Sequence, residues 1–248
     1  MYQFFINTED IMEDAIHIRN PQSVNHIKNV LRMKTGEKIC LCCQEKEKEY
    51  TCSILSLSNE EILAAIEDID GENRELPCEI VLYQGLPKGD KMELIIQKAV
   101  ELGAKRIVPV SMKRCVMKLD EKKAKKKIDR WNMIAESAAK QSKRNRIPEV
   151  SSVLTLRQAL EEADHLDAIL IPYEDAKGMT HTRSVLQDMK GKQSIGIFIG
   201  PEGGFEESEV EAVKEHGGHV ITLGHRILRT ETAGFTTLSI LMYLLEED

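Results

Sequence analysis

The spacing of hydrophobic residues divides the chain into a region with strand periodicity and a region with mixed periodicity. Alternating or continuous apolar runs predict strands at 2–6, 38–43, 50–57 and 61–69. Apolar residues at positions 24, 27, 30 and 31 predict an amphipathic helix over 21–33, with Pro21 in its first turn. The first 70 or so residues therefore predict a small β-barrel with one helix.

From Cys78 onward the pattern alternates between strands and helices, which is typical of an α/β domain with a mainly parallel sheet. Strands are predicted at 79–83, 106–110, 168–172, 195–199 and 219–223, and the main helices at 92–102, around Trp131, and at 232–246. The polar stretch 70–77 contains Gly71 and Pro77 and reads as a linker. We therefore expect two domains, 1–72 and 73–248.

Two unusual loops follow the strands predicted at 195–199 and 219–223. The first is Gly-Pro-Glu-Gly-Gly at 200–204, and the second is His-Arg-Ile-Leu-Arg-Thr-Glu-Thr at 225–232. Ligands of open α/β sheets bind at the carboxyl ends of the strands, so these loops predict a binding crevice. The first loop matches neither G-x-G-x-x-G nor a phosphate-binding P-loop.

Acidic residues cluster in and after the first loop, at Glu202, Glu206, Glu207 and Glu209. Such a cluster would repel a phosphate, so it favours a neutral or cationic ligand. The alternative is a glycine-rich turn followed by an acidic first helical turn, which stabilises the helix dipole without any ligand.

Charge is distributed unevenly. The chain carries a net charge of −7, yet residues 113–148 hold thirteen Lys and Arg against four Asp and Glu, a local charge of +9 that leaves −16 for the rest. This asymmetry is typical of a polyanion-binding surface on an acidic body, and the alternative is a solvated helix face.

The cysteines and the apolar runs exclude some classes of protein. Cys40 and Cys43 form a C-x-x-C, but it lies in a predicted strand and no second pair accompanies it, so we predict buried thiols and no metal. No apolar run has the length of a membrane span, and the first residues lack a signal-peptide pattern. We expect a cytoplasmic protein that does not contact a membrane.

Several stretches resemble one known family. IGPEGG at 199–204 and LGHRILRTETAG at 223–234 resemble the C-terminal motifs of the SPOUT-class RNA methyltransferases, specifically the 16S rRNA uracil-N3 methyltransferase family (RsmE). The basic segments 113–127 and 130–150 are also similar to that family, as is H-x-x-x-V-L-R-x-x-x-G at 26–36 to its PUA-like RNA-binding domain. Gln3 and Cys115 depart from it, since the family more usually has an arginine and a serine there.

The resemblance implies a SPOUT-type α/β knot, with a C-terminal trefoil knot and a mainly parallel sheet, preceded by a PUA-like β-barrel. It implies S-adenosylmethionine as cofactor, and this sulfonium cation agrees with the acidic loop. It further implies that the protein methylates N3 of a uridine in 16S rRNA or in the small ribosomal subunit, and that it acts as a homodimer.

Candidate site residues follow from the motifs. The charge that spreads over the uracil carbonyls needs a cation, for which we choose Arg229, with Arg226 second; Glu231 and Glu202 are candidate bases, and water is another. An ion pair between Arg229 and Glu231 that only fixes the loop is the alternative. The cofactor candidates are Tyr173, Gly200, Gly203, Gly204, Leu223, Gly224, Ile227, Leu228, Thr232 and Ala233. The RNA candidates are His26, Arg32, Lys88, Arg114, Lys122, Lys123, Gln141, Ser142 and Arg144.

Two other functions stay open at this point. One is a SPOUT methyltransferase that acts on a ribose 2′-hydroxyl or on another RNA. The other is an RNA-binding protein without cofactor that uses the basic helix alone.

Overall fold

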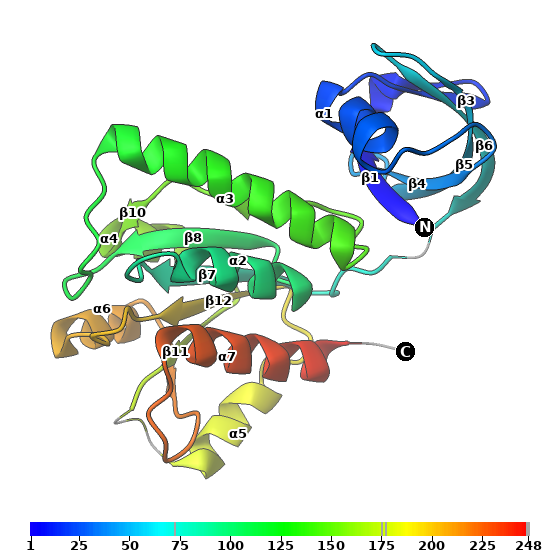
Figure 1. The fold of residues 1–248 in the computed structure, drawn as a ribbon. Coiled ribbons are helices and arrows are strands. Elements are labelled where there is room, and N and C mark those ends of the chain that lie inside the picture. Colours follow the sequence, from blue (N-terminus) through cyan, green and yellow to red (C-terminus); the bar gives the residue numbers. More distant parts are fainter. Residues whose placement is uncertain (72, 175, 177, 247–248) are drawn as a thin grey trace. The chain divides into compact units, whose positions relative to one another are not determined.

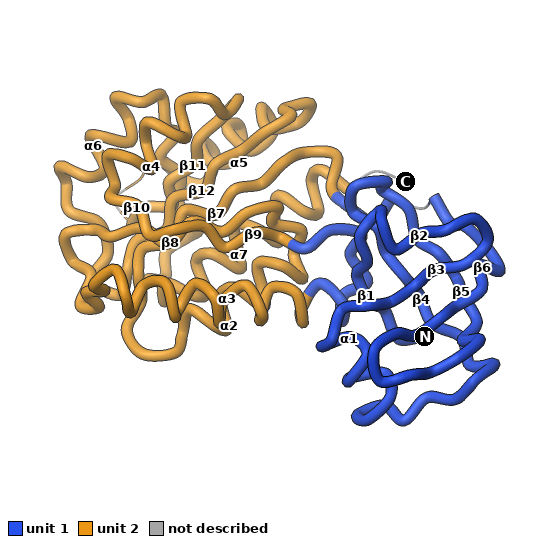
Figure 2. Tube along the Cα trace, turned by 90° about the horizontal axis from the view of Figure 1, so that it is seen from above, with its two compact units in different colours: residues 1–75, 139–147 blue, residues 76–138, 148–248 orange. Residues whose placement is uncertain are grey.

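A computed structural model describes residues 1–71, 73–174, 176 and 178–246 (Figure 1). These residues form two compact units (Figure 2). The first comprises Met1–Glu75 and Ala139–Ile147, and the second comprises Leu76–Ala138 and the chain from Pro148 onward. The predicted domain boundary after residue 72 falls on a residue outside the described ones. The sequence pattern had not assigned 139–147 to the first unit.

The first unit is a curled six-stranded sheet with the order β1-β4-β5-β6-β3-β2 over the described residues. β1 pairs with β4 in parallel and the other pairs are antiparallel. The strands are β1 (Tyr2–Ile6), β2 (Ile11–Met12), β3 (Ala15–Ile18), β4 (Lys38–Cys43), β5 (Lys48–Leu57) and β6 (Ile62–Asp70), and the 3-10 turn Thr8–Asp10 precedes β2. Alternate side chains of these strands fill the core, with Phe4, Ile16, Leu41 and Ile54 among the buried ones.

The predicted helix over 21–33 is α1 (Pro21–Asn25), which continues as a π-helical turn over His26–Val30. Asn20 caps α1, because its side-chain oxygen accepts hydrogen bonds from the backbone N–H groups of Gln22 and Ser23. The helical turn ends at Val30, two residues before Arg32, which has a φ of +54°. Val24 and Ile27 are buried in the barrel core, as their spacing predicted.

The second unit is built on a seven-stranded parallel sheet, with the order β10-β8-β7-β12-β11-β13 and with β9 paired to β8. Its strands are β7 (Glu79–Gly85), β8 (Arg106–Ser111), β9 (Glu149–Val150), β10 (Leu154–Thr155), β11 (Ala168–Pro172), β12 (Ser194–Ile199) and β13 (His219–Ile221). The central strands are buried on both faces, which explains their continuous apolar runs.

Helices cover both faces of this sheet. The helices α2 (Lys91–Glu101), α3 (Glu121–Gln141) and α7 (Thr230–Leu245) lie on one face. The helices α4 (Leu156–Ala163), α5 (Met179–Gln187) and α6 (Glu207–Glu215) lie on the other, as Figures 1 and 2 show. The expected α/β architecture with a mainly parallel sheet after a small barrel-like domain is confirmed, whereas the trefoil knot stays a prediction. No helix among the described residues is long and apolar enough to cross a membrane.

Candidate active site

The loops that follow β7, β11, β12 and β13 meet at the carboxyl edge of the parallel sheet. β12 pairs with β7 on one side and with β11 on the other, and β13 pairs with β11. The loops after β11, β12 and β13 line one cavity of about 750 Å³. The sequence-based expectation that the two glycine-bearing loops share one hollow is therefore confirmed.

Glycines allow the loops to approach one another closely. A Cβ on Gly85 would lie 2.7 Å from the backbone nitrogen of Pro201, so only glycine lets the end of β7 pass beneath the loop after β12. Gly204 has a φ of +69°, and its N–H donates a 2.9 Å hydrogen bond to the carbonyl of Pro201. The loop after β12 is thus a tight turn built against the end of β7.

A hydrogen-bond chain joins this loop to the start of α7. The Thr230 hydroxyl donates to the carbonyl of Gly200 at 2.6 Å and accepts from Gln84 Nε2 at 2.9 Å. Gln84 is fully buried in β7, and its Nε2 also donates to the carbonyl of Gly85. These hydrogen bonds connect β7, the loop after β12 and α7, so they fix the positions of the segments that line this side of the cavity.

Most of the predicted cofactor residues line this cavity. The lining includes Tyr173, Gly200, Gly203, Gly204, Leu223, Gly224, Ile227, Leu228 and Ala233. Thr232 is exposed and lies outside it. The lining also includes Ile199, Pro201 and Thr230, which lie within the quoted motifs but were not among the candidates, and Lys91, Met179, Phe205 and Thr222, which lie outside the motifs. Strand order decides which residues line the cavity, and the periodicity of the sequence does not show strand order.

Among the candidate catalytic residues, Glu202, Arg226 and Arg229 line the cavity and Glu231 does not. Arg226 and Arg229 are exposed, and neither has an ion pair within the described part of the chain. The alternative of an Arg229–Glu231 ion pair is absent among those residues, because Glu231 Oε2 faces Lys91 Nζ at 3.6 Å instead. Both arginines are therefore available to a ligand.

Glu202 is held by the loop after β7. Its carboxylate accepts hydrogen bonds from the backbone N–H of Lys88 at 3.0 and 3.2 Å and pairs with Lys91 Nζ at 2.9 Å. Burial alone would raise the pKa of Glu202, but the hydrogen bonds from Lys91 and from the Lys88 backbone outweigh burial and lower it. The bond to Glu202 also raises the pKa of Lys91. Glu202 is thus an ionised anchor and a weak proton acceptor.

The other acidic residues near the loop are also engaged within the protein or lie away from the cavity. Glu206 pairs with Lys113 Nζ at 3.1 Å, and Glu209 accepts hydrogen bonds from the backbone N–H groups of Lys113 and Glu206, each at 2.9 Å. None of Glu206, Glu207 and Glu209 lines the cavity. Lys91 and Lys113, which lie in segments far apart in sequence, pair with Glu202 and Glu206, so the acidic cluster is largely neutralised within the protein and by itself does not select a cationic ligand.

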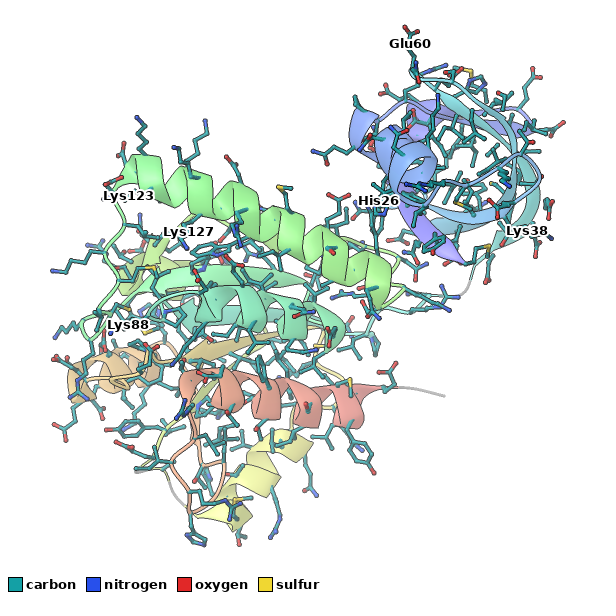
Figure 3. All side chains as sticks on the ribbon, viewed as in Figure 1. His26, Lys38, Glu60, Lys88, Lys123 and Lys127 are labelled. Carbon is teal, nitrogen blue, oxygen red and sulfur yellow. The ribbon has the colours of Figure 1, made fainter. Side chains whose placement is uncertain are left out.

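The RNA candidates of the second unit lie near the loops or on α3. Arg114 is exposed, and its Nη1 donates to the carbonyl of Gly203 at 3.0 Å. Lys122 and Lys123 are exposed in the first turn of α3, and Figure 3 marks Lys123 there and Lys88 in the loop before α2. These positions are compatible with contact to a polyanion, and their binding of RNA stays a prediction.

The RNA candidates of the first unit have mixed environments. His26, which is labelled in Figure 3, is exposed. Its ring packs edge-on against Phe4, with ring centroids 5.8 Å apart. Arg32 and Gln141 are exposed, while Ser142 is half-buried. Arg144 is only 4% exposed, and its guanidinium pairs with Glu75. That partner gives Arg144 a structural contact, which the basic run in the sequence could not reveal.

The cysteines are buried, free thiols, as expected. Strand alternation separates Cys43, which faces the barrel core, from Cys40 and Cys42, whose sulfur atoms lie within 4.8 Å of a Glu49 oxygen. Glu49 is already paired with Arg74, and a hydrogen bond to Cys42, followed by burial, raises the pKa of Cys40. This cluster satisfies its own polar groups, so we assign no metal to it.

Comparison with known proteins assigns a family to each of the two units. Residues 74–242 match the family model for an RNA methyltransferase domain, and residues 18–67 match that for an RNA methyltransferase PUA domain. The ribosomal RNA small subunit methyltransferase E of Bacillus subtilis is 40% identical over 251 residues, covering 99% of this chain and 98% of the relative.

Solved structures extend the similarity to the whole fold. A ribosomal RNA small subunit methyltransferase E from Neisseria gonorrhoeae, bound to S-adenosyl methionine, is 31% identical with a TM-score of 0.83 and covers 98% of both chains. A Legionella pneumophila methyltransferase in complex with the cofactor SAM is 35% identical with a TM-score of 0.83, covering 98% of this chain and 97% of its own. The resemblance seen in the motifs is confirmed, and the chain belongs to the RNA methyltransferase family that includes ribosomal RNA small subunit methyltransferase E.

Proposed function

We propose that this protein transfers a methyl group from S-adenosylmethionine to N3 of a uridine in 16S rRNA. The observation that carries the proposal is the cavity at the carboxyl edge of the parallel sheet, which is lined by a glycine turn and by two arginines, Arg226 and Arg229. Membership of the family supports the class of reaction. The position N3 follows from the motif resemblance.

The cavity suits the cofactor in size and in chemistry. Its volume of about 750 Å³ falls within the usual range of small-molecule sites, roughly 300–1,000 Å³. Backbone groups of Gly203, Gly204 and Leu223 would hold its polar edges, and Ile227 and Leu228 would cover the adenine. When bound, the cofactor supplies the methyl carbon, whose bond to sulfur breaks as the bond to N3 forms and the N3 proton leaves.

Residues of this chain would then handle the charge and the proton. Arg229 would donate hydrogen bonds to the uracil carbonyl oxygens, because a guanidinium stays charged and stabilises the negative charge that develops there. Arg226 would support it. A water molecule would accept the proton, since Glu231 does not line the cavity and the lowered pKa of Glu202 makes that carboxylate a weak base.

The substrate RNA would contact the basic surfaces. Lys122 and Lys123 of α3, Lys88 and Arg114 would meet phosphates from the second unit, and His26 from the first. We further propose that the protein works in the cytoplasm as a homodimer that uses α7, where Tyr243 leaves 83% of its surface exposed. Leu238, Leu241 and Leu245 of the same helix are buried within the chain and belong to its core.

Mass mapping of 16S rRNA tests the proposal. A strain that lacks this gene should lose one methylated uridine, and the wild-type chain, but not a chain with Arg229→Ala, should restore it. Nucleoside chromatography then separates 3-methyluridine from a 2′-O-methylated product. Calorimetry with S-adenosylmethionine gives the second test, and absence of binding would leave an RNA-binding protein without this activity.

A further inference from the structure

Lys91, the first residue of α2, lies between two carboxylates from different parts of the fold. Its Nζ is 2.9 Å from Glu202 Oε1 and 3.6 Å from Glu231 Oε2. One third of the Lys91 side chain is exposed, and 15% of the Glu231 side chain. The ammonium group therefore sits partly protected from solvent, where charge contacts are screened less than at an open surface.

The two carboxylates come from two different elements that line the cavity. Glu202 lies in the turn after β12, and Glu231 lies in the first turn of α7, next to Thr230. Gly200 and Thr230 line the cavity from these two elements. A cation that contacts both carboxylates thus connects the two walls from a third element, α2.

The two carboxylates differ in how much they depend on Lys91. Glu202 keeps the backbone N–H of Lys88 as a donor when Lys91 is removed. Glu231 Oε2 is buried and has no hydrogen-bond donor among the described residues, so Lys91 is the cation that offsets its charge. Without Lys91, two like charges would face each other near the cavity and push the walls apart.

We infer that Lys91 is a positioning residue, which holds the turn after β12 and the start of α7 at the separation that the methyl donor requires. This inference rests on the proposed function for its consequence in cofactor affinity. The coupling of the two walls by Lys91 is a property of the protein alone. It can therefore be measured without cofactor.

The experiment compares full-length variants in two assays. Lys91→Met removes the charge, Lys91→Arg keeps it, and Lys91→Met with Glu202→Gln removes the repulsion as well. Lys98→Met is the matched control, because Lys98 lies on the same helix and pairs with Glu101 at 2.6 Å. Hydrogen exchange of the cofactor-free protein reports on peptides covering 200–206 and 226–234, and calorimetry gives the Kd for S-adenosylmethionine.

We expect Lys91→Met to speed exchange in those two segments only and to weaken cofactor binding about tenfold, which corresponds to about 1.4 kcal/mol. Lys91→Arg should retain wild-type values, the double variant should recover most of the affinity, and Lys98→Met should change neither. Unchanged exchange and affinity in Lys91→Met would overturn the inference. So would faster exchange throughout the chain, or no recovery in the double variant. If the wild type binds no cofactor while the two segments still respond, the proposed function fails and the coupling by Lys91 stands.

Discussion

Replacement of Thr230 by valine tests the hydrogen-bond chain that connects β7, the turn after β12 and α7. Valine keeps the shape of threonine and removes its hydroxyl. That hydroxyl donates to the carbonyl of Gly200 at 2.6 Å and accepts from Gln84 Nε2 at 2.9 Å. Thr230 is 6% exposed and Gln84 is fully buried, so water cannot replace the lost partner easily.

The expected loss of stability follows from these contacts. A buried polar group left without its partner costs about 1–3 kcal/mol, and each lost hydrogen bond about 1 kcal/mol. Gln84 Nε2 keeps its bond to the carbonyl of Gly85, so the Gly200 carbonyl bears most of the penalty. We expect Thr230→Val to lower the free energy of unfolding by about 2–3 kcal/mol. For a domain of this size that lowers Tm by about 4–12 °C.

Thermal unfolding followed by calorimetry measures this change, and Thr230→Ser is the matched control. Serine keeps the hydroxyl and loses only a methyl group, so it should stay closer to the wild type than valine does. Calorimetric titration with S-adenosylmethionine adds a second measurement, since the Gly200 carbonyl lies in the cavity wall. A valine variant as stable as the wild type, or a serine variant less stable than valine, would refute the reasoning.

Three further outcomes are expected. Arg229→Ala should abolish methylation while the Kd for S-adenosylmethionine changes little, whereas equal loss of both would make Arg229 a cofactor ligand. Lys122→Glu with Lys123→Glu should weaken RNA binding and reduce the slope of log affinity against log salt by roughly 2, about one for each lost phosphate contact, in a salt titration; an unchanged slope would leave these lysines as solvated residues. Burial raises the pKa of the Cys78 thiol from 9.0 to about 11, so the folded state holds this proton more tightly than the unfolded state. The free energy of unfolding should therefore fall as pH rises from 9 to 11, and fall less steeply in Cys78→Ala; equal slopes in denaturant titrations would contradict this.

The spacing of hydrophobic residues was sufficient to predict the main helices and strands. The strand predicted at 168–172 matches β11, and the predicted helix over 92–102 matches α2 within one residue at each end. Both follow from periodicity, which depends only on neighbouring residues. The glycine turn at 200–204 was also readable, because positive φ and close approach leave glycine as the residue that fits.

The partners of charged residues were not readable in this way. Arg144 reads as part of a basic run, but the fold buries it against Glu75, which lies 69 positions away. Glu202 reads as a free carboxylate, but it accepts a hydrogen bond from the backbone N–H of Lys88, which lies 114 positions away in the loop before α2. A sequence lists charges without their distances, and those distances decide whether a charge is available to a ligand.

The sequence by itself determined the two-part organisation, the parallel sheet and the position of the binding loops, because each depends on short-range periodicity and on backbone freedom at glycine. Only the tertiary structure decided that Lys91 joins the two walls of the cavity, that Thr230 connects them to β7, and that Arg226 and Arg229 stay unpaired within the described residues. Strand order brings these groups together, and strand order arises from packing between segments that lie far apart along the chain.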